Sequence, residues 1–185
     1  MSSTYSPNLR IELIGTGEQS GTWGSTTNTN LGTLVEDSVS GYAAVPVISA
    51  NQAFTANNGT ADQARSAVIA LTTTTGANFA VYAPPAEKTY LLRNASAYTA
   101  TIYNSTVLGN TTAAGAGIAV PAGAVMNVFT DGTDFYAVNS LNTAAFSVLE
   151  SGGKLVVKYG ATTVFSISNA GVITALSNIV SNGTP

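Results

Sequence analysis

The hydrophobic and polar positions of the first 45 residues follow two patterns in turn. In residues 10–15, RIELIG, the apolar Ile11 and Leu13 alternate with Glu12. A two-residue period is typical of a strand, so we expect a strand or an extended arm here.

The second pattern predicts a short helix over residues 28–40. Four apolar residues recur there with a 3.6-residue period: Leu31, Leu34, Val35 and Val39. This spacing gives one apolar stripe. Thr29 or Asn30 could cap the start of the helix, and Gly41 suits the left-handed position after its end. So short a helix is marginal alone and needs a partner surface.

The single tryptophan, Trp23, lies in GTGEQSGTWGSTTNTNL, residues 15–31, among glycines and small polar residues. The glycines allow the backbone positive φ angles, so we expect a loop. One interpretation is that Trp23 closes a local core over Leu31 and Leu34. The other is that arm, loop and helix form a docking element in which Trp23 fills a pocket on another chain.

Residues 46–140 contain seven short segments rich in β-branched and aromatic residues, separated by Gly, Pro, Asn or Asp. They are 64–73, 77–85, 88–96, 98–106, 116–123, 124–132 and 133–139. Such regular spacing predicts an antiparallel β-sandwich or small barrel. The clearest hairpin is FTDGTDFYAV, with its turn at Asp131 and Gly132.

The last segment, residues 141–185, predicts two or three further strands. Val164, Ser166 and Ser168 alternate with Phe165 and Ile167, a turn follows at 169–171, and then comes VITAL. A unit with so little core is marginal alone and gains if several copies stack.

Charge and composition exclude several classes of function. Charged residues make up 8% of the chain, against about 25% in an ordinary soluble domain. Six basic and nine acidic residues provide no basic surface for nucleic acid. There is no Cys and no His, which removes disulfides, imidazole bases and the usual zinc sites, so we expect no cofactor. The apolar stretches fall short of the ~18 residues that span a membrane.

The acidic residues do not suggest an enzyme. A glycosidase needs two carboxylates that flank the bond, and Asp131 and Asp134 form the one close pair that has aromatic neighbours, Phe135 and Tyr136. Turn chemistry accounts for these aspartates better, and two carboxylates are too few for a Ca²⁺ loop. Phe135 and Tyr136 remain candidate glycan contacts, which keeps a carbohydrate-binding module open as an alternative.

The segment GEQSGTWGSTTNTNLGTL, residues 17–34, resembles the N-terminal segment of virion structural proteins, mostly tail fibres, of tailed phages from marine and freshwater bacteria. The middle segments follow the order seen in phage fibre domains, and FSISNAGVITAL is similar to a short repeat of fibre shafts.

The resemblance implies a homotrimeric, β-rich virion protein, assembled in the host cytoplasm and not an enzyme. Its N-terminal segment would dock to a tail adaptor or hub through Trp23 and the apolar stripe of the helix, and a host surface glycan is a further partner. The alternative is a capsid decoration protein, of the cement or head-fibre kind, held by the major capsid protein. Neither reading involves nucleic acid or membrane insertion.

Overall fold

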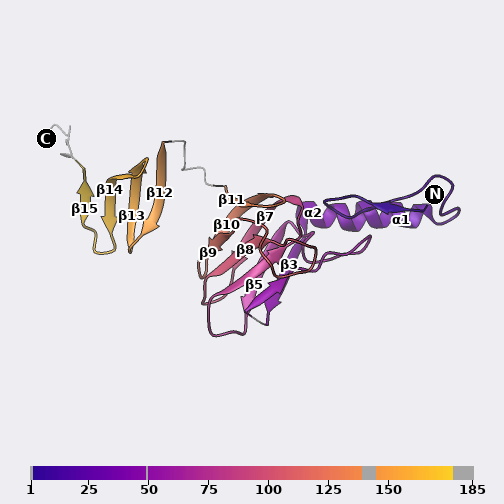
Figure 1. The fold of residues 1–185 in the computed structure, drawn as a ribbon, viewed down its shortest axis with the longest axis horizontal. Coiled ribbons are helices and arrows are strands. Elements are labelled where there is room, and N and C mark those ends of the chain that lie inside the picture. Colours follow the sequence, from indigo (N-terminus) through magenta and orange to yellow (C-terminus); the bar gives the residue numbers. More distant parts are fainter. Residues whose placement is uncertain (1, 49, 139–144, 177–185) are drawn as a thin grey trace. The chain divides into compact units, whose positions relative to one another are not determined.

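The computed structural model describes residues 2–48, 50–138 and 145–176. It is mainly β, as predicted, with one helical segment near the N-terminus (Figure 1). Its internal contacts divide the chain into two units, Met1–Val138 and Asn139–Pro185. The predicted boundary between residues 45 and 46 lies inside strand β3 (Tyr42–Val47).

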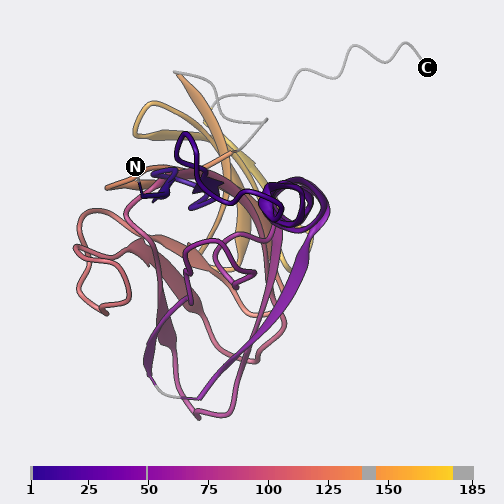
Figure 2. The ribbon, with the colours of Figure 1, turned by 90° about the vertical axis from the view of Figure 1, so that its right-hand side faces the viewer.

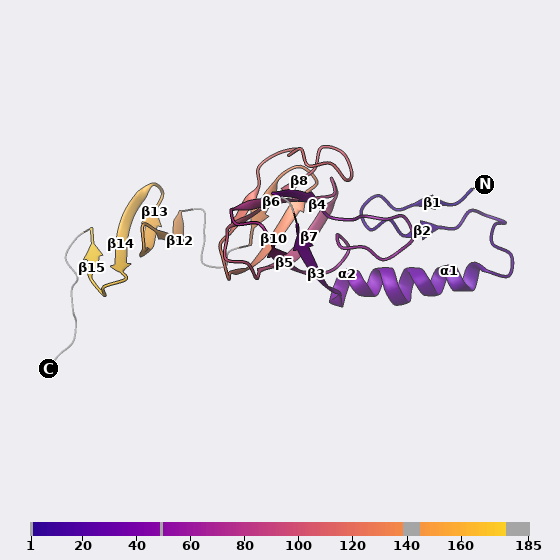
Figure 3. The ribbon, with the colours of Figure 1, turned by 90° about the horizontal axis from the view of Figure 1, so that it is seen from below.

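The N-terminal arm is a two-stranded antiparallel ribbon, followed by a helix that starts earlier than predicted. Strands β1 (Thr4–Tyr5) and β2 (Glu12–Leu13) pair with each other. The helix runs without interruption through α1 (Trp23–Thr29), a π-helical stretch (Asn30–Val35) and α2 (Glu36–Ser40). Figures 1 and 3 show the arm and the helix extending together, away from the sheets of the same unit.

Three details of the helix prediction are wrong. Trp23 is the first helical residue and does not lie in a loop, so Thr29 and Asn30 lie inside the helix and cap nothing. The Thr22 side chain makes no capping bond; the amides of Thr22 and Trp23 bond the carbonyl of Gln19 instead. Gly41 is extended, with φ −66° and ψ 144°, because the chain passes directly into β3.

The chain then alternates between two sheets. Strands β3, β5 (Val68–Thr73) and β7 (Glu87–Asn94) lie side by side and parallel in one sheet. Strands β4 (Asn51–Ala53), β6 (Phe79–Ala83) and β8 (Ala100–Asn104) do the same in the other. Each pair of successive strands is therefore one coil of a short solenoid. Figure 2 looks along the helix, with these coils beside it.

Antiparallel strands complete both sheets. Strand β9 (Ile118–Val120) pairs with β8, β10 (Val125–Asp131) pairs with β7, and β11 (Phe135–Ala137) pairs with β10. The orders are β11-β10-β7-β5-β3 and β4-β6-β8-β9, and neither sheet closes into a barrel. All seven predicted strands and the hairpin at Asp131 are confirmed, but the prediction of an antiparallel sandwich is wrong for β3 to β8. The residue pattern of a strand does not record the direction of its neighbour.

The core lies between the two sheets and is built from alternate residues of their strands. The first sheet contributes Val45, Leu71, Leu92 and Val128, and the second contributes Val81, Ile102 and Val120; all seven are fully buried. Burying a side chain of this size stabilises the fold by about 1.5–3 kcal/mol. The solenoid coils are thus held by ordinary apolar packing.

The C-terminal unit is one antiparallel sheet of four strands, where two or three were predicted. The strands are β12 (Phe146–Ser151), β13 (Lys154–Tyr159), β14 (Thr162–Ser168) and β15 (Ile173–Ala175). The predicted turn at 169–171 joins β14 to β15, and Gly171 has a φ of 76° there. Residues 141–144 and 177–185 of the predicted segment lie outside the described residues.

Candidate assembly surface

The helix Trp23–Ser40 leaves most of its apolar side chains exposed. Leu34 is fully buried and Val35 is half-buried, whereas Trp23, Leu31 and Val39 are 61%, 62% and 75% exposed. The predicted stripe is therefore divided, because the π-helical stretch has i→i+5 bonds and breaks the 3.6-residue period on which the prediction depended. The interpretation of Trp23 as a cover over Leu31 and Leu34 is wrong for this chain by itself.

Polar side chains attach the arm to the helix. Gln19 Nε2 donates to Glu12 Oε1 at 2.6 Å, and Thr26 Oγ1 donates to Gln19 Oε1 at 2.5 Å. The carboxamide of Asn30 bonds the backbone of Glu12. The arm thus occupies the polar side of the helix, and the exposed apolar residues are left for another partner.

Further exposed apolar residues lie on the outer face of the five-stranded sheet, among polar ones such as Thr89, Arg93 and Asn127. The cross-strand pairs place its residues on one side: Leu91 lies opposite Asn127, and Phe129 lies between Thr89 and Tyr136. Its exposed apolar members are Tyr42, Leu91, Val125, Phe129, Tyr136 and Val138. On strand β7, Leu91 is the apolar residue of this outer face, and Glu87, Thr89 and Arg93 are its exposed polar neighbours on the same strand.

Of the two aromatic residues proposed for glycan contact, one is buried and the other is exposed. Phe135 is 2% exposed and packs against Tyr90, with ring centroids 6.2 Å apart, so its role as a glycan contact is contradicted. Tyr136 is 41% exposed and stacks on Phe129, which is 42% exposed, with centroids 4.9 Å apart. The exposed aromatic partner of Tyr136 is therefore Phe129 and not Phe135.

The C-terminal sheet also exposes apolar side chains on one face. Leu155 of β13 and Ile173 of β15 both lie opposite Ile167 of β14, and both are about half exposed. Apolar side chains that gather on one exposed face favour association with a partner. This unit, too, would gain stability from a partner.

The carboxylates of Asp131 and Asp134 accept backbone amides. Asp131 Oδ1 accepts the amides of Thr133 and Asp134, and Asp134 Oδ1 accepts the amide of Ala116. Within residues 2–48, 50–138 and 145–176, no group of three or more Asp, Glu, His or Cys side chains could hold a metal ion. In the same described ranges, no helix is long and apolar enough to cross a membrane.

Comparison of the chain with protein-family models, with curated proteins and with solved structures finds no match.

Sequence reasoning singled out the helix but missed the outer face of the sheet. The signal was present, since Leu91 follows the buried Tyr90 and precedes the buried Leu92. Three consecutive large apolar residues in a strand indicate cover on both faces.

Proposed function

We propose that the chain is a structural subunit of a phage virion, in a tail fibre or fibre base, that associates with copies of itself and docks through its N-terminal segment. The observation that carries the proposal is the uncovered helix Trp23–Ser40, which projects from the sheets and exposes Trp23, Leu31 and Val39. A helix with one fully buried side chain gains little from its own chain. A partner that covers the apolar residues would supply the missing stabilisation.

The resemblance of residues 17–34 to phage fibre proteins also supports this helix as the docking element. That segment contains Trp23, Leu31 and Leu34, and so spans most of the helix. The low content of charged residues also supports burial between subunits, because unpaired charges are costly in an interface whereas Thr, Ser and Asn form hydrogen bonds there.

The test is the oligomeric state of the purified chain, measured by sedimentation velocity. We expect the wild type to sediment as a homotrimer and Leu31→Gln to sediment as a smaller species. Thr33→Gln, at another exposed position of the helix, is the matched control and should not change the oligomeric state. A monomeric wild type, or equal behaviour of the two variants, would reject the helix as the contact between copies.

Leu34 is unsuitable for this test because its side chain is fully buried. A charged residue there would unfold the helix before it could report on assembly.

A capsid decoration protein is the alternative within the virion, and copy number separates the two. A few trimers per particle, measured against the major capsid protein by quantitative mass spectrometry, would support the tail. A number comparable to the capsid subunits would support decoration, and absence from particles would reject both.

A carbohydrate-binding role is favoured by one specific observation, the exposed stack of Phe129 on Tyr136. Aromatic faces of this kind bind the apolar face of a sugar, and the Asp131 carboxylate, 3.1 Å from the Tyr136 hydroxyl, could accept sugar hydroxyls. Glycan-array binding that Phe129→Ala abolishes would support this role. If the folded wild type binds no glycan on the array, the carbohydrate-binding role is rejected.

A further inference from the structure

The sequence contains two Asn–Gly pairs, and one of them lies against the N-terminal arm. They are Asn58–Gly59 and Asn182–Gly183, of which the second lies outside the described residues. An asparagine that precedes glycine loses its side-chain amide most easily, because glycine has no Cβ to hinder attack by its backbone nitrogen. Asn58 is exposed, and no hydrogen bond to a described residue holds its carboxamide. Its side chain is therefore free to react.

Three residues of the arm lie against Gly59. The Gly59 amide donates to the Arg10 carbonyl at 2.9 Å. A Cβ atom at this position would lie 3.2 Å from Cε1 of Tyr5 and 4.0 Å from Cβ of Glu12, so a residue of each arm strand packs there. The φ of Gly59 is 65°. Both this conformation and the close approach of the arm require glycine.

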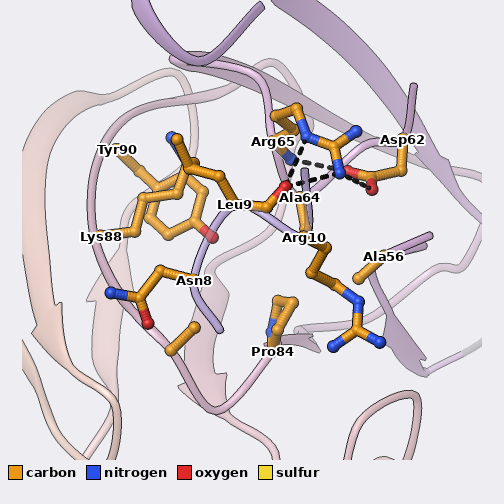
Figure 4. A pocket seen from close by; sticks show the side chains of 11 residues that line it. Asn8, Leu9, Arg10, Ala56, Asp62, Ala64, Arg65, Pro84, Lys88 and Tyr90 are labelled. Atoms are coloured by element: carbon orange, nitrogen blue, oxygen red, sulfur yellow. Dashed lines mark hydrogen bonds and ion pairs between the residues drawn. The ribbon is translucent and has the colours of Figure 1, made fainter. Parts of the chain in front are cut away.

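Arg65 fastens the arm to the loop of residues 57–60. Its guanidinium donates to the carbonyl of Leu9 in the arm and to two carbonyls of the loop. Figure 4 shows Arg65 between Leu9 and Asp62. Its Nη2 atom lies 3.2 Å from Asp62 Oδ2, and both side chains are 2% exposed. The loop and the arm thus share one buried anchor.

Deamidation of Asn58 requires the nitrogen atom that the arm engages. The Gly59 nitrogen loses its proton and attacks Cγ of Asn58, which forms a succinimide ring, breaks the bond from Cγ to the carboxamide nitrogen and releases ammonia. Water then opens the ring at either carbonyl and leaves an aspartyl or isoaspartyl residue. In the docked state the Gly59 N–H is bonded to the Arg10 carbonyl, and the packed arm restrains the backbone. The docked arm therefore opposes the reaction.

We propose that Asn58 is a site of spontaneous deamidation controlled by the arm, and that the modification then keeps the arm released. The isoaspartyl product has an additional carbon in the backbone directly before Gly59, which displaces the amide that bonds Arg10. Either product also adds a negative charge next to Gly59, against which the Glu12 side chain packs. This site is independent of the proposed virion role.

Incubation of the purified chain at mildly alkaline pH, followed by peptide mapping with mass spectrometry, measures deamidation at position 58 separately from that at Asn182. We expect the rate in the folded wild type to be lower than in the guanidinium-unfolded chain by roughly tenfold or more, because the reaction requires local opening. Asn30→Ala, which removes the bonds between the helix and Glu12, should raise the rate roughly tenfold. Asn28→Ala is the matched control, because Asn28 is exposed on the same helix.

Hydrogen exchange of residues 4–13 reports the opening of the arm in each variant, and the rate of deamidation at Asn58 should follow it. Tyr5→Ala, which removes the ring that lies against Gly59, supplies a second variant. Equal rates in the folded and the unfolded wild type, or a rate that does not follow exchange of the arm, would overturn control by the arm.

The effect of the modification on the arm is measured on the aged wild type. Ion exchange separates the deamidated fraction, which carries one more negative charge, from the unmodified one. Residues 4–13 should exchange faster in the deamidated fraction, whereas β5 to β8 should exchange equally in both. Equal exchange of the arm in the two fractions would overturn the second part of the proposal.

Discussion

The carboxamide of Asn30 pairs with both backbone groups of Glu12. Its Nδ2 donates to the Glu12 carbonyl at 2.8 Å, and its Oδ1 accepts the Glu12 amide at 3.1 Å. The side chain thus bonds strand β2 much as a neighbouring strand would. Two short strands pair across only two residues in the arm, so this contact with the helix is a large part of what holds them.

Replacing Asn30 should release the arm from the helix. We expect Asn30→Ala to lower the free energy of unfolding by about 1–3 kcal/mol, because the backbone groups of Glu12 lose their partner. Amide exchange at residues 4–13 should speed up while exchange in β5 to β8 stays slow. Asn28→Ala, at an exposed position of the same helix, is the control. Equal exchange of the arm in both variants would contradict this role of Asn30.

Arg65 should be the most sensitive basic residue of the chain. Arg65→Met removes the partner of the buried Asp62 and the donors to three backbone carbonyls. Breaking a buried ion pair from one side costs about 3–5 kcal/mol. Urea unfolding measures the loss, and Arg93→Met, at an exposed position, should cost far less. A small effect of Arg65→Met would contradict this role of the buried ion pair.

The sequence predicted the strands well but not the path that connects them. Alternation of exposed and buried residues, as in Thr89 to Asn94 of β7, reports which side chains face the core, and it is the same for parallel and antiparallel neighbours. The parallel pairing of β5 with β3 and β7 depends on residues more than twenty positions away. Local pattern contains no information on that choice.

The candidate surface was predicted only in part, for two physical reasons. The π-helical stretch alters which residues share one side of the helix, so Leu34 is buried while Leu31, which the period placed beside it, is exposed. The outer sheet face depends on cross-strand register, which brings Phe129 beside Tyr136 and leaves Phe135 in the core. A shift of one residue in the register of a strand would exchange the side chains that face the core with those that face outward.

The buried Asn94 should be essential to the stability of the core. It is fully buried at the end of β7; its Nδ2 donates to the carbonyls of Tyr98 and Val120, and its Oδ1 accepts from Ser96. Asn94→Ala leaves these groups without partners, so we expect a loss of about 2–4 kcal/mol in the free energy of unfolding. Asn127→Ala, at an exposed position of the adjacent strand, should change it little.

The hairpin between β10 and β11 should respond to acid through Asp131. The backbone amides of Asp134 and Thr133 bond its carboxylate, at 2.8 and 2.9 Å, and lower the pKa of Asp131, with a further contribution from the Tyr136 hydroxyl. A carboxyl group whose pKa is lowered by folding stabilises the folded state at pH values above its unfolded pKa. This stabilisation is lost as the pH falls through the folded pKa. Chemical shifts of Gly132 and Thr133 should therefore move at a lower pH than they would beside an unperturbed aspartate.

The same contact should shift Tyr136 in the opposite direction. The hydrogen bond to Asp131 raises the pKa of the Tyr136 phenol. The contribution of this phenol to the stability of the fold is therefore complete below its unfolded pKa, and it is lost as the pH rises through its folded pKa. In Asp131→Asn we expect the pKa of Tyr136 to fall towards about 10, measured by NMR titration of the ring. Asp134→Asn should shift it less, because Asp134 makes the smallest contribution. Equal shifts in the two variants would mean that general charge, and not the hydrogen bond, sets the acidity of the phenol.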